Sequence, residues 1–130
     1  SWTTAMAPAG ETIPKFNDPA SARYRTLMLM IDEQYHQTMQ IPLLQGRSFQ
    51  ISDSANAPKV ALVNEAFARK FFPSGGALGR QIRKRDGPPI EIVGILANSK
   101  YNNIRVRDPQ PIVFVAYRQE ADLEGAHYLV

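Results

Sequence analysis

Residues 59–73, which read KVALVNEAFARKFFP, decide the fold. Apart from one lysine, the first five residues are apolar, which is typical of a short buried strand. Asn64 follows as a helix N-cap, because its side-chain oxygen accepts a hydrogen bond from an amide of the first turn. Phe67 and Phe71 lie four residues apart and share one helix face, and Pro73 ends the helix. The stretch predicts a buried strand that runs directly into a short helix.

Further elements follow outward from this unit. The helix also carries an i,i+4 charge pair, Glu65 and Arg69, on its outer side. Apolar patterning and turn residues predict strands over 24–30, 81–85, 90–96 and 112–117, and the start of another at 128–130. They also predict a short helix of roughly two turns between Asp32 and Pro42 and a glycine-hinged loop over 41–49. This order predicts an α+β fold with a small mixed, mainly antiparallel sheet and two short helices.

The strand over 90–96 has two apolar faces. Strict alternation places Ile92 and Leu96 on one face and Val93 and Ile95 on the other, with Gly94 between them. A strand with two apolar faces is typical of the covered part of a sheet. We therefore expect it to lie inside the sheet rather than at an edge.

The ends of the chain differ from its middle. Residues 1–22 contain four Pro and Gly breakers and no periodic pattern, so we interpret them as an extended lead-in on the surface and residues 23–130 as the domain. The chain has 130 residues, starts with Ser1 and has no apolar run near the 20 residues of a membrane span. Both ends look cut, and we expect a piece of a larger protein.

The residues that carry chemistry are few. The absence of cysteine excludes disulfides and thiol chemistry. His36 and His127 lie far apart in sequence, and the turn before Gln81 lacks the lysine and hydroxyl residue of a phosphate-binding loop. Glu91 alternates with apolar neighbours as the outward residue of a strand. We therefore predict no catalytic residue, no cofactor and no metal, with a hydrolase of unrecognised site as a remote alternative.

Positive charge gathers in the second half of the chain. The net charge is +3, but residues 80–107 hold seven basic residues against two acidic ones. Arg83, Lys84 and Arg85 are the candidate face for an anionic partner such as lipid, cell-wall polymer or nucleic acid. Tyr101 is the aromatic residue of this region, and the paired aromatics of RNA-binding sheets are missing, so nucleic acid is not expected.

Four segments in this order and spacing resemble one family. They are residues 35–49, with IPLLQGRSF; residues 60–73, with VALVNEAFARKFFP; residues 78–82 followed by 90–95, with LGRQI and IEIVGI; and residues 109–117, with PQPIVFVAY. They resemble the MacB-like periplasmic core domain of FtsX/MacB-type ABC transporter permeases. His36, Gln40 and Ala116 depart from the family pattern, at positions of packing or turn formation.

The resemblance implies scaffold roles for its signature residues and a place in a larger protein. The signature residues are Gly46, Arg47, Asn64, Glu65, Gly79 and Gly94. The resemblance implies a non-enzymatic domain on the periplasmic side of the bacterial inner membrane, part of a permease with one membrane helix before the domain and three after it. It also implies a separate ATP-binding domain or subunit, an adaptor or cargo protein, and a dimeric full-length protein.

Overall fold

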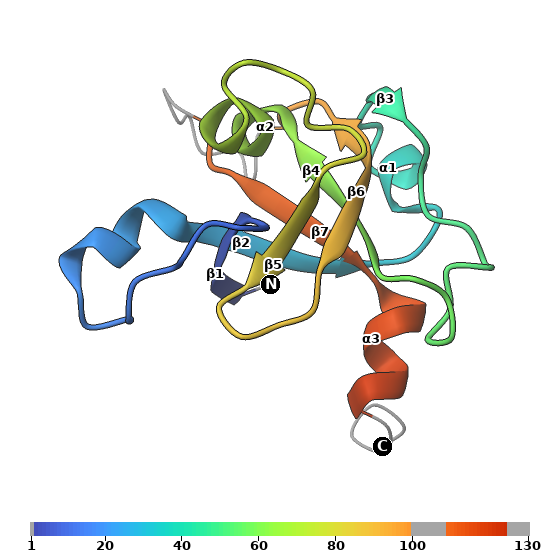
Figure 1. Ribbon diagram of the computed structural model, residues 1–130. Helices are drawn as coiled ribbons and strands as arrows, with labels where there is room; N and C mark the ends of the chain where they lie inside the picture. Colours follow the sequence, from blue (N-terminus) through green and yellow to red (C-terminus); the bar gives the residue numbers. More distant parts are fainter. Residues whose placement is uncertain (1, 100–108, 125–130) are drawn as a thin grey trace.

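The computed structural model describes residues 2–99 and 109–124. Its centre is a seven-stranded mixed sheet with the strand order β3-β6-β4-β7-β2-β1-β5 (Figure 1). The pairs β2–β7 and β4–β6 are parallel and the other pairs are antiparallel. The elements are β1 (Trp2–Pro8), η1 (Pro19–Tyr24), β2 (Arg25–Ile31), α1 (Tyr35–Thr38), β3 (Leu43–Gly46), β4 (Val60–Asn64), α2 (Glu65–Phe71), β5 (Gln81–Lys84), β6 (Ile90–Leu96), β7 (Ile112–Ala116) and α3 (Tyr117–Glu124).

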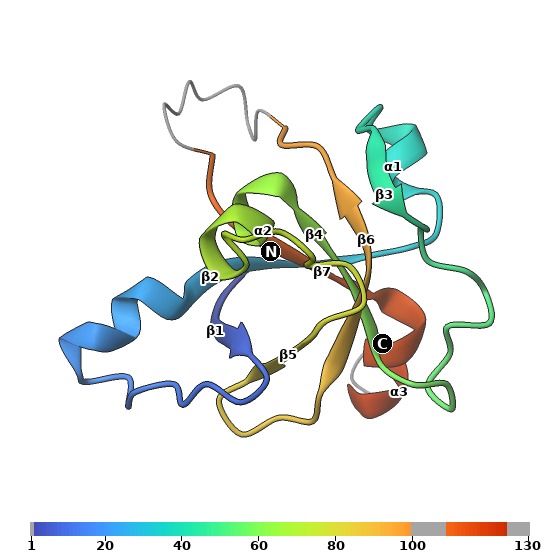
Figure 2. The ribbon, with the colours of Figure 1, turned by 45° about the horizontal axis from the view of Figure 1, so that its top comes forward.

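The sheet closes on itself. β5 pairs with β1 on one side and with the start of β6 on the other, so that β6, β4, β7, β2, β1 and β5 form a ring (Figure 2). β3 pairs only with the second half of β6 and therefore lies outside this ring. Closure removes most free strand edges, which is how small β structures avoid edge-to-edge association.

Two apolar cores lie on the two faces of the closed sheet. The inner core takes side chains from all the ring strands, and α2 packs Phe67 and Phe71 onto it. The outer core lies over β2, β7, β4 and β6 and is covered by α1, β3 and the segment that follows β3. The inner core includes Met6, Met28, Val63, Ile82, Ile92 and Val113, each fully buried, and the outer core includes Ile31, Phe49, Leu62, Leu96 and Phe114.

The structure confirms the central predictions. β4 runs into α2 with Asn64 as its N-cap, and the helix buries Phe67 and Phe71. The strands predicted over 24–30, 81–85, 90–96 and 112–117 are β2, β5, β6 and β7, and their ends differ from the prediction by at most one residue. β5 and β6 form an antiparallel pair. The α+β class and the mainly antiparallel sheet are confirmed as well.

A bulge in β6 overturns the predicted side-chain alternation. The register between β4 and β6 shifts where Ile92 and Gly94 pair with consecutive residues of β4. One extra residue reverses the faces beyond it. Ile92 and Ile95 therefore share the inner core, whereas Leu96 lies in the outer core with Val93 against it.

Three other local expectations differ from the structure. The first part of residues 1–22 is extended, but it forms β1 inside the ring rather than a surface segment. The loop predicted over 41–49 contains β3, and the helix expected after Asp32 is a single turn over Tyr35–Thr38. α3 was not predicted.

Three sequence expectations fall outside the described residues: the strand at 128–130, His127 and Tyr101. Within residues 2–99 and 109–124, no helix has the length and apolar character to span a bilayer.

Candidate functional site

Gly46 and Gly94 face each other across the β3–β6 pair, where the two strands approach closely. Gly46 has φ +75°, and a Cβ there would meet the Val93 carbonyl oxygen, a methyl of Leu78 at 2.7 Å and the Gly94 Cα at 2.9 Å. A Cβ on Gly94 would meet the Arg47 carbonyl oxygen and a methyl of Leu62 at 2.7 Å. Both signature glycines therefore let β3 lie against β6.

This close approach positions Arg47, the next signature residue. Its amide donates to the Val93 carbonyl at 2.9 Å, and its guanidinium donates to both oxygens of Asp53, at 2.9 and 3.2 Å. Asp53 is buried and also accepts from the Gln50 amide at 2.8 Å. Burial raises the pKa of Asp53, but the Arg47 guanidinium and the Gln50 amide outweigh it and hold the pKa below its usual value.

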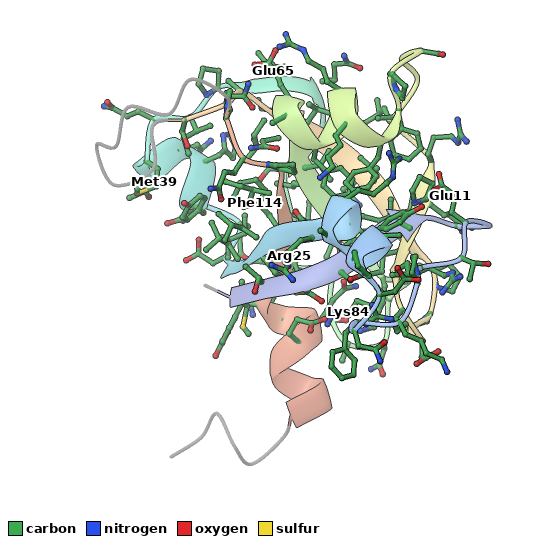
Figure 3. All side chains as sticks on the ribbon, turned by 90° about the vertical axis from the view of Figure 1, so that its left-hand side faces the viewer. Glu11, Arg25, Met39, Glu65, Lys84 and Phe114 are labelled. Carbon is green, nitrogen blue, oxygen red and sulfur yellow. The ribbon has the colours of Figure 1, made fainter. Side chains whose placement is uncertain are left out.

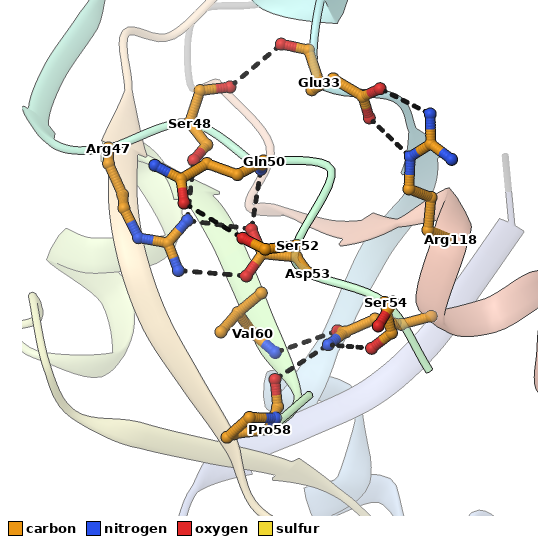
Figure 4. A network of polar contacts seen from close by, with 11 residues as sticks. Glu33, Arg47, Ser48, Gln50, Ser52, Asp53, Ser54, Pro58, Val60 and Arg118 are labelled. Carbon is orange, nitrogen blue, oxygen red and sulfur yellow. Dashed lines mark hydrogen bonds and ion pairs between the residues drawn. The ribbon is translucent and has the colours of Figure 1, made fainter. Parts of the chain in front are cut away.

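The segment closed by Arg47 and Asp53 is fastened to α3 (Figure 4). Gln119 is buried; its oxygen accepts from the Val60 amide at 3.1 Å, and its nitrogen donates to the carbonyls of Pro58 and Ser54. Such a buried amide with every polar atom engaged fixes the segments it joins. The first turn of α3 therefore holds the segment that leads into β4.

Two ion pairs flank Gln119 on α3. Arg118 donates to both oxygens of Glu33, at 2.9 and 3.3 Å, and Lys59 lies 3.3 Å from Glu120. The hydrogen bonds from Arg118 lower the pKa of Glu33, and Glu33 in turn raises the pKa of Arg118. We call Glu33, Lys59, Arg118, Gln119 and Glu120 the α3 clasp. Sequence reasoning missed the clasp, because its members are scattered along the chain and share no motif.

Acidification is expected to weaken the Arg47–Asp53 contact. Because the pKa of Asp53 is lower in the folded than in the unfolded chain, its stabilising contribution is complete above about pH 4 and is lost as the pH falls through the lowered value. Asp53→Asn should reduce the slope of unfolding free energy against pH in this acidic range by up to about 1.4 kcal/mol per pH unit. Urea denaturation at a series of pH values measures both slopes, and equal slopes would contradict the assignment.

The remaining signature residues serve local structure. The Asn64 oxygen accepts from the amides of Phe67 at 2.9 Å and Ile112 at 3.0 Å, so it joins α2 to β7 as well as capping the helix. Glu65 accepts from the Asn98 amide at 3.3 Å and pairs with Arg69 at 3.6 Å.

The predicted anionic face is divided by the structure. The Arg83 guanidinium donates to the Glu11 carbonyl at 2.9 Å, and that of Arg85 donates to the Pro14 carbonyl at 2.6 Å. Lys84 lies opposite Met6 in the register, on the other face of β5. Arg83 and Arg85 therefore hold the segment after β1, and the three side chains do not form one surface.

The described residues hold no group of three or more His, Cys, Asp or Glu that could bind a metal ion. His36 lies 3.3 Å from the Ile41 carbonyl through its Nδ1. In the same part of the chain, every buried side-chain nitrogen and oxygen has a hydrogen-bond partner.

Comparison with known proteins gives the family. The sequence model of the MacB-like periplasmic core domain matches residues 3–128. The chain belongs to this family. A curated relative of this MacB-like domain is the uncharacterized ABC transporter permease YvrN of Bacillus subtilis strain 168, 26% identical over 97 residues. That match covers 73% of this chain but 24% of the relative, so the chain spans about a quarter of that relative's length.

Solved structures show the same fold. The periplasmic region of MacB from Actinobacillus actinomycetemcomitans matches with a TM-score of 0.66 and 14% identity, over 95% of this chain and 49% of that one. A domain of a putative permease from Porphyromonas gingivalis matches with a TM-score of 0.60 and 18% identity, over 89% and 46%. The extracellular domain of the transporter YknZ from Gram-positive bacteria matches with a TM-score of 0.57 and 17% identity, over 97% and 59%. The chain is an extracytoplasmic domain of a MacB-like ABC transporter permease.

Proposed function

We propose that this MacB-like domain is a non-enzymatic coupling element of its permease. A separate ATP-binding domain or subunit hydrolyses ATP, the membrane helices move, and this domain changes its contacts with an adaptor or cargo protein outside the membrane. The family match over residues 3–128 carries the proposal. In this proposal the full-length permease acts in the membrane as a dimer, without a nucleic-acid partner.

The α3 clasp supports this role. α3 follows β7 directly, and β7 is bonded to β2 and β4 in the middle of the sheet. Through Glu33 and Lys59, the clasp ties α3 to the ends of the segments that cover the outer core. A displacement of α3 would therefore move the sheet and its outer cover together rather than bend α3 away from them.

A charge swap in the full-length permease tests the coupling. Arg118→Glu places two carboxylates where Arg118 now donates to Glu33, and we expect transport to fall severalfold while the ATP-binding subunit still hydrolyses ATP. The double variant Glu33→Arg, Arg118→Glu restores an ion pair and should restore transport. Transport at the wild-type level in the single variant, or specific ATP binding by the isolated domain, would contradict the proposal.

The second function open to the chain is a basic-faced interaction module. Arg83, Lys84 and Arg85 motivated it, but two of these side chains donate to backbone carbonyls of the segment after β1. These three cations therefore do not meet one anionic partner together, but Arg85 keeps one terminal nitrogen outside its contacts with Pro14.

A further inference from the structure

Part of the outer face of the sheet has no cover. α1, β3 and the segment after β3 cover one side of this face, over the outer core. Arg83 and Arg85 hold the segment between β1 and η1 against the other side, through the carbonyls of Glu11 and Pro14. Between the two covers, near the start of β2, Thr3 and Arg25 are exposed and form an open strip; Figure 3 labels Arg25.

A hollow of about 170 Å³ opens in this strip over Ala5. Ala5 lies opposite Arg25 of β2. Arg85 comes directly after Lys84, which lies opposite Met6, so it continues the register to the other side of Ala5. Side chains at one register position of neighbouring strands point to the same face. The small methyl group of Ala5 therefore lies between the side chains of Arg25 and Arg85, and it leaves the space above it empty as the hollow.

Apart from Ala5 and Phe16, the residues that line the hollow have side chains that can donate hydrogen bonds. The lining is formed by Thr3, Thr4, Ala5, Phe16, Ser21, Arg25 and Arg85 and includes no acidic residue. Within residues 2–99 and 109–124, the side chains of Arg25, Thr3 and Thr4 make no hydrogen bond and no ion pair. Arg85 uses its Nε and one terminal nitrogen on Pro14, which leaves the other terminal nitrogen for a ligand.

A second hollow adjoins the first. It has about 310 Å³, shares Thr3 and Arg25 with the first, and is otherwise lined by Thr26, Leu27, Gln110 and Pro111, again without an acid. Phe16 stands at the rim of the first hollow with 83% of its surface exposed. A ligand seated over Ala5 therefore has room for a larger group beside it.

We propose that the hollow over Ala5 binds a phosphate group. Two guanidiniums approach from opposite sides, and Thr3, two residues before Ala5 in β1, places its hydroxyl on the same face, so the donors converge from several directions. A tetrahedral phosphate offers oxygens in those directions, whereas a carboxylate offers two oxygens in one plane. The phosphate ester belongs either to a soluble molecule or to a lipid head group, and its recognition does not depend on the coupling role.

Titration of the 130-residue chain with inorganic phosphate and with glycerol phosphate tests the site, with acetate at equal ionic strength as the carboxylate control. Amide chemical shifts of Ala5 and Arg25 should move with phosphate. Arg25→Gln should weaken binding roughly tenfold, because it removes charged hydrogen bonds. Ala5→Leu should abolish binding, because the larger side chain fills the hollow while every charge is kept.

The matched control is Arg80→Gln, which removes the same charge from an exposed arginine outside both hollows. It should leave the affinity for phosphate within about twofold of wild type, a smaller change than the loss of one charged hydrogen bond would cause. Binding to vesicles of phosphatidylglycerol, with phosphatidylcholine vesicles as the control, shows whether the phosphate belongs to a lipid or to a soluble molecule. Stronger binding to phosphatidylglycerol than to glycerol phosphate assigns a lipid head group, and stronger binding to glycerol phosphate assigns a soluble ester. Equal response to phosphate and acetate, or equal weakening by Arg80→Gln and Arg25→Gln, would overturn the proposal.

Discussion

Gly46→Ala is expected to lower the free energy of unfolding by about 4 kcal/mol, a large part of the stability of an ordinary domain. Two costs combine at this position. The φ of +75° strains any residue with a Cβ by roughly 1–2 kcal/mol, and the added methyl would meet the Val93 carbonyl, Leu78 and Gly94. Overpacking against backbone atoms costs roughly a further 1–3 kcal/mol. The urea midpoint at an unchanged m-value measures the loss.

Two other glycines separate these costs. Gly79 has φ +85° but open space around its Cβ position, so Gly79→Ala should cost about 1 kcal/mol from strain alone. Gly94→Ala keeps an ordinary φ but meets the Arg47 carbonyl and Leu62, so it should cost about 3 kcal/mol from packing alone. If Gly46→Ala proved no more harmful than Gly79→Ala, the close approach of β3 to β6 would be contradicted.

Asn64→Ala is expected to cost about 3 kcal/mol, because one side chain serves three backbone groups. It caps α2 through the Phe67 amide, and it also accepts from the Ile112 amide and donates to the Gln110 carbonyl at 2.8 Å. A lost cap costs about 1 kcal/mol, and each buried group left without a partner roughly 1–3 kcal/mol. Thermal and urea denaturation measure the effect.

A serine at this position distinguishes the cap from the tie to β7. Asn64→Ser keeps a good capping oxygen on a shorter side chain, so it should recover about 1 kcal/mol of the loss. Asn56→Ala, at an exposed asparagine before β4, should change stability by less than about 0.5 kcal/mol. Equal stability of the serine and alanine variants would show that the helix cap contributes little and that β7 accounts for the effect.

The sequence predicted those parts of the fold in which local signals agree. In residues 59–73 the strand, the cap, the apolar helix face and the proline all indicate one structure, and the structure confirms it. Gly94 lies where the backbone of Arg47 approaches β6 closely, and a glycine inside an apolar strand leaves space for such a neighbouring backbone.

The other parts depend on distant contacts. The bulge in β6 falls beside Gly94, but a glycine inside a strand does not by itself distinguish a bulge from close packing, and the bulge moves Leu96 to the outer core. β1 contains Thr3, Thr4 and two alanines and lacks a strong alternating pattern, so only its pairing with β2 and β5 defines it. The partners of Gln119 lie about 60 residues away, at separations of 59 and 61, and no sequence pattern indicates that pairing. For the same reason Arg25 and Arg85 were not grouped before the register was known.

The closed ring has a kinetic consequence. The tie between β2 and β7 spans most of the chain, with Thr26 donating to Pro111 across a sequence separation of 85. Contacts of such high sequence separation slow folding, because the chain loses the entropy of loop closure before the stabilising hydrogen bonds form. Until β7 has joined, β2 and β4 each keep an open apolar edge, which is prone to pairing with other chains. A chain truncated before residue 112 should therefore aggregate rather than fold in part, and during synthesis the sheet stays vulnerable to aggregation until β7 is available.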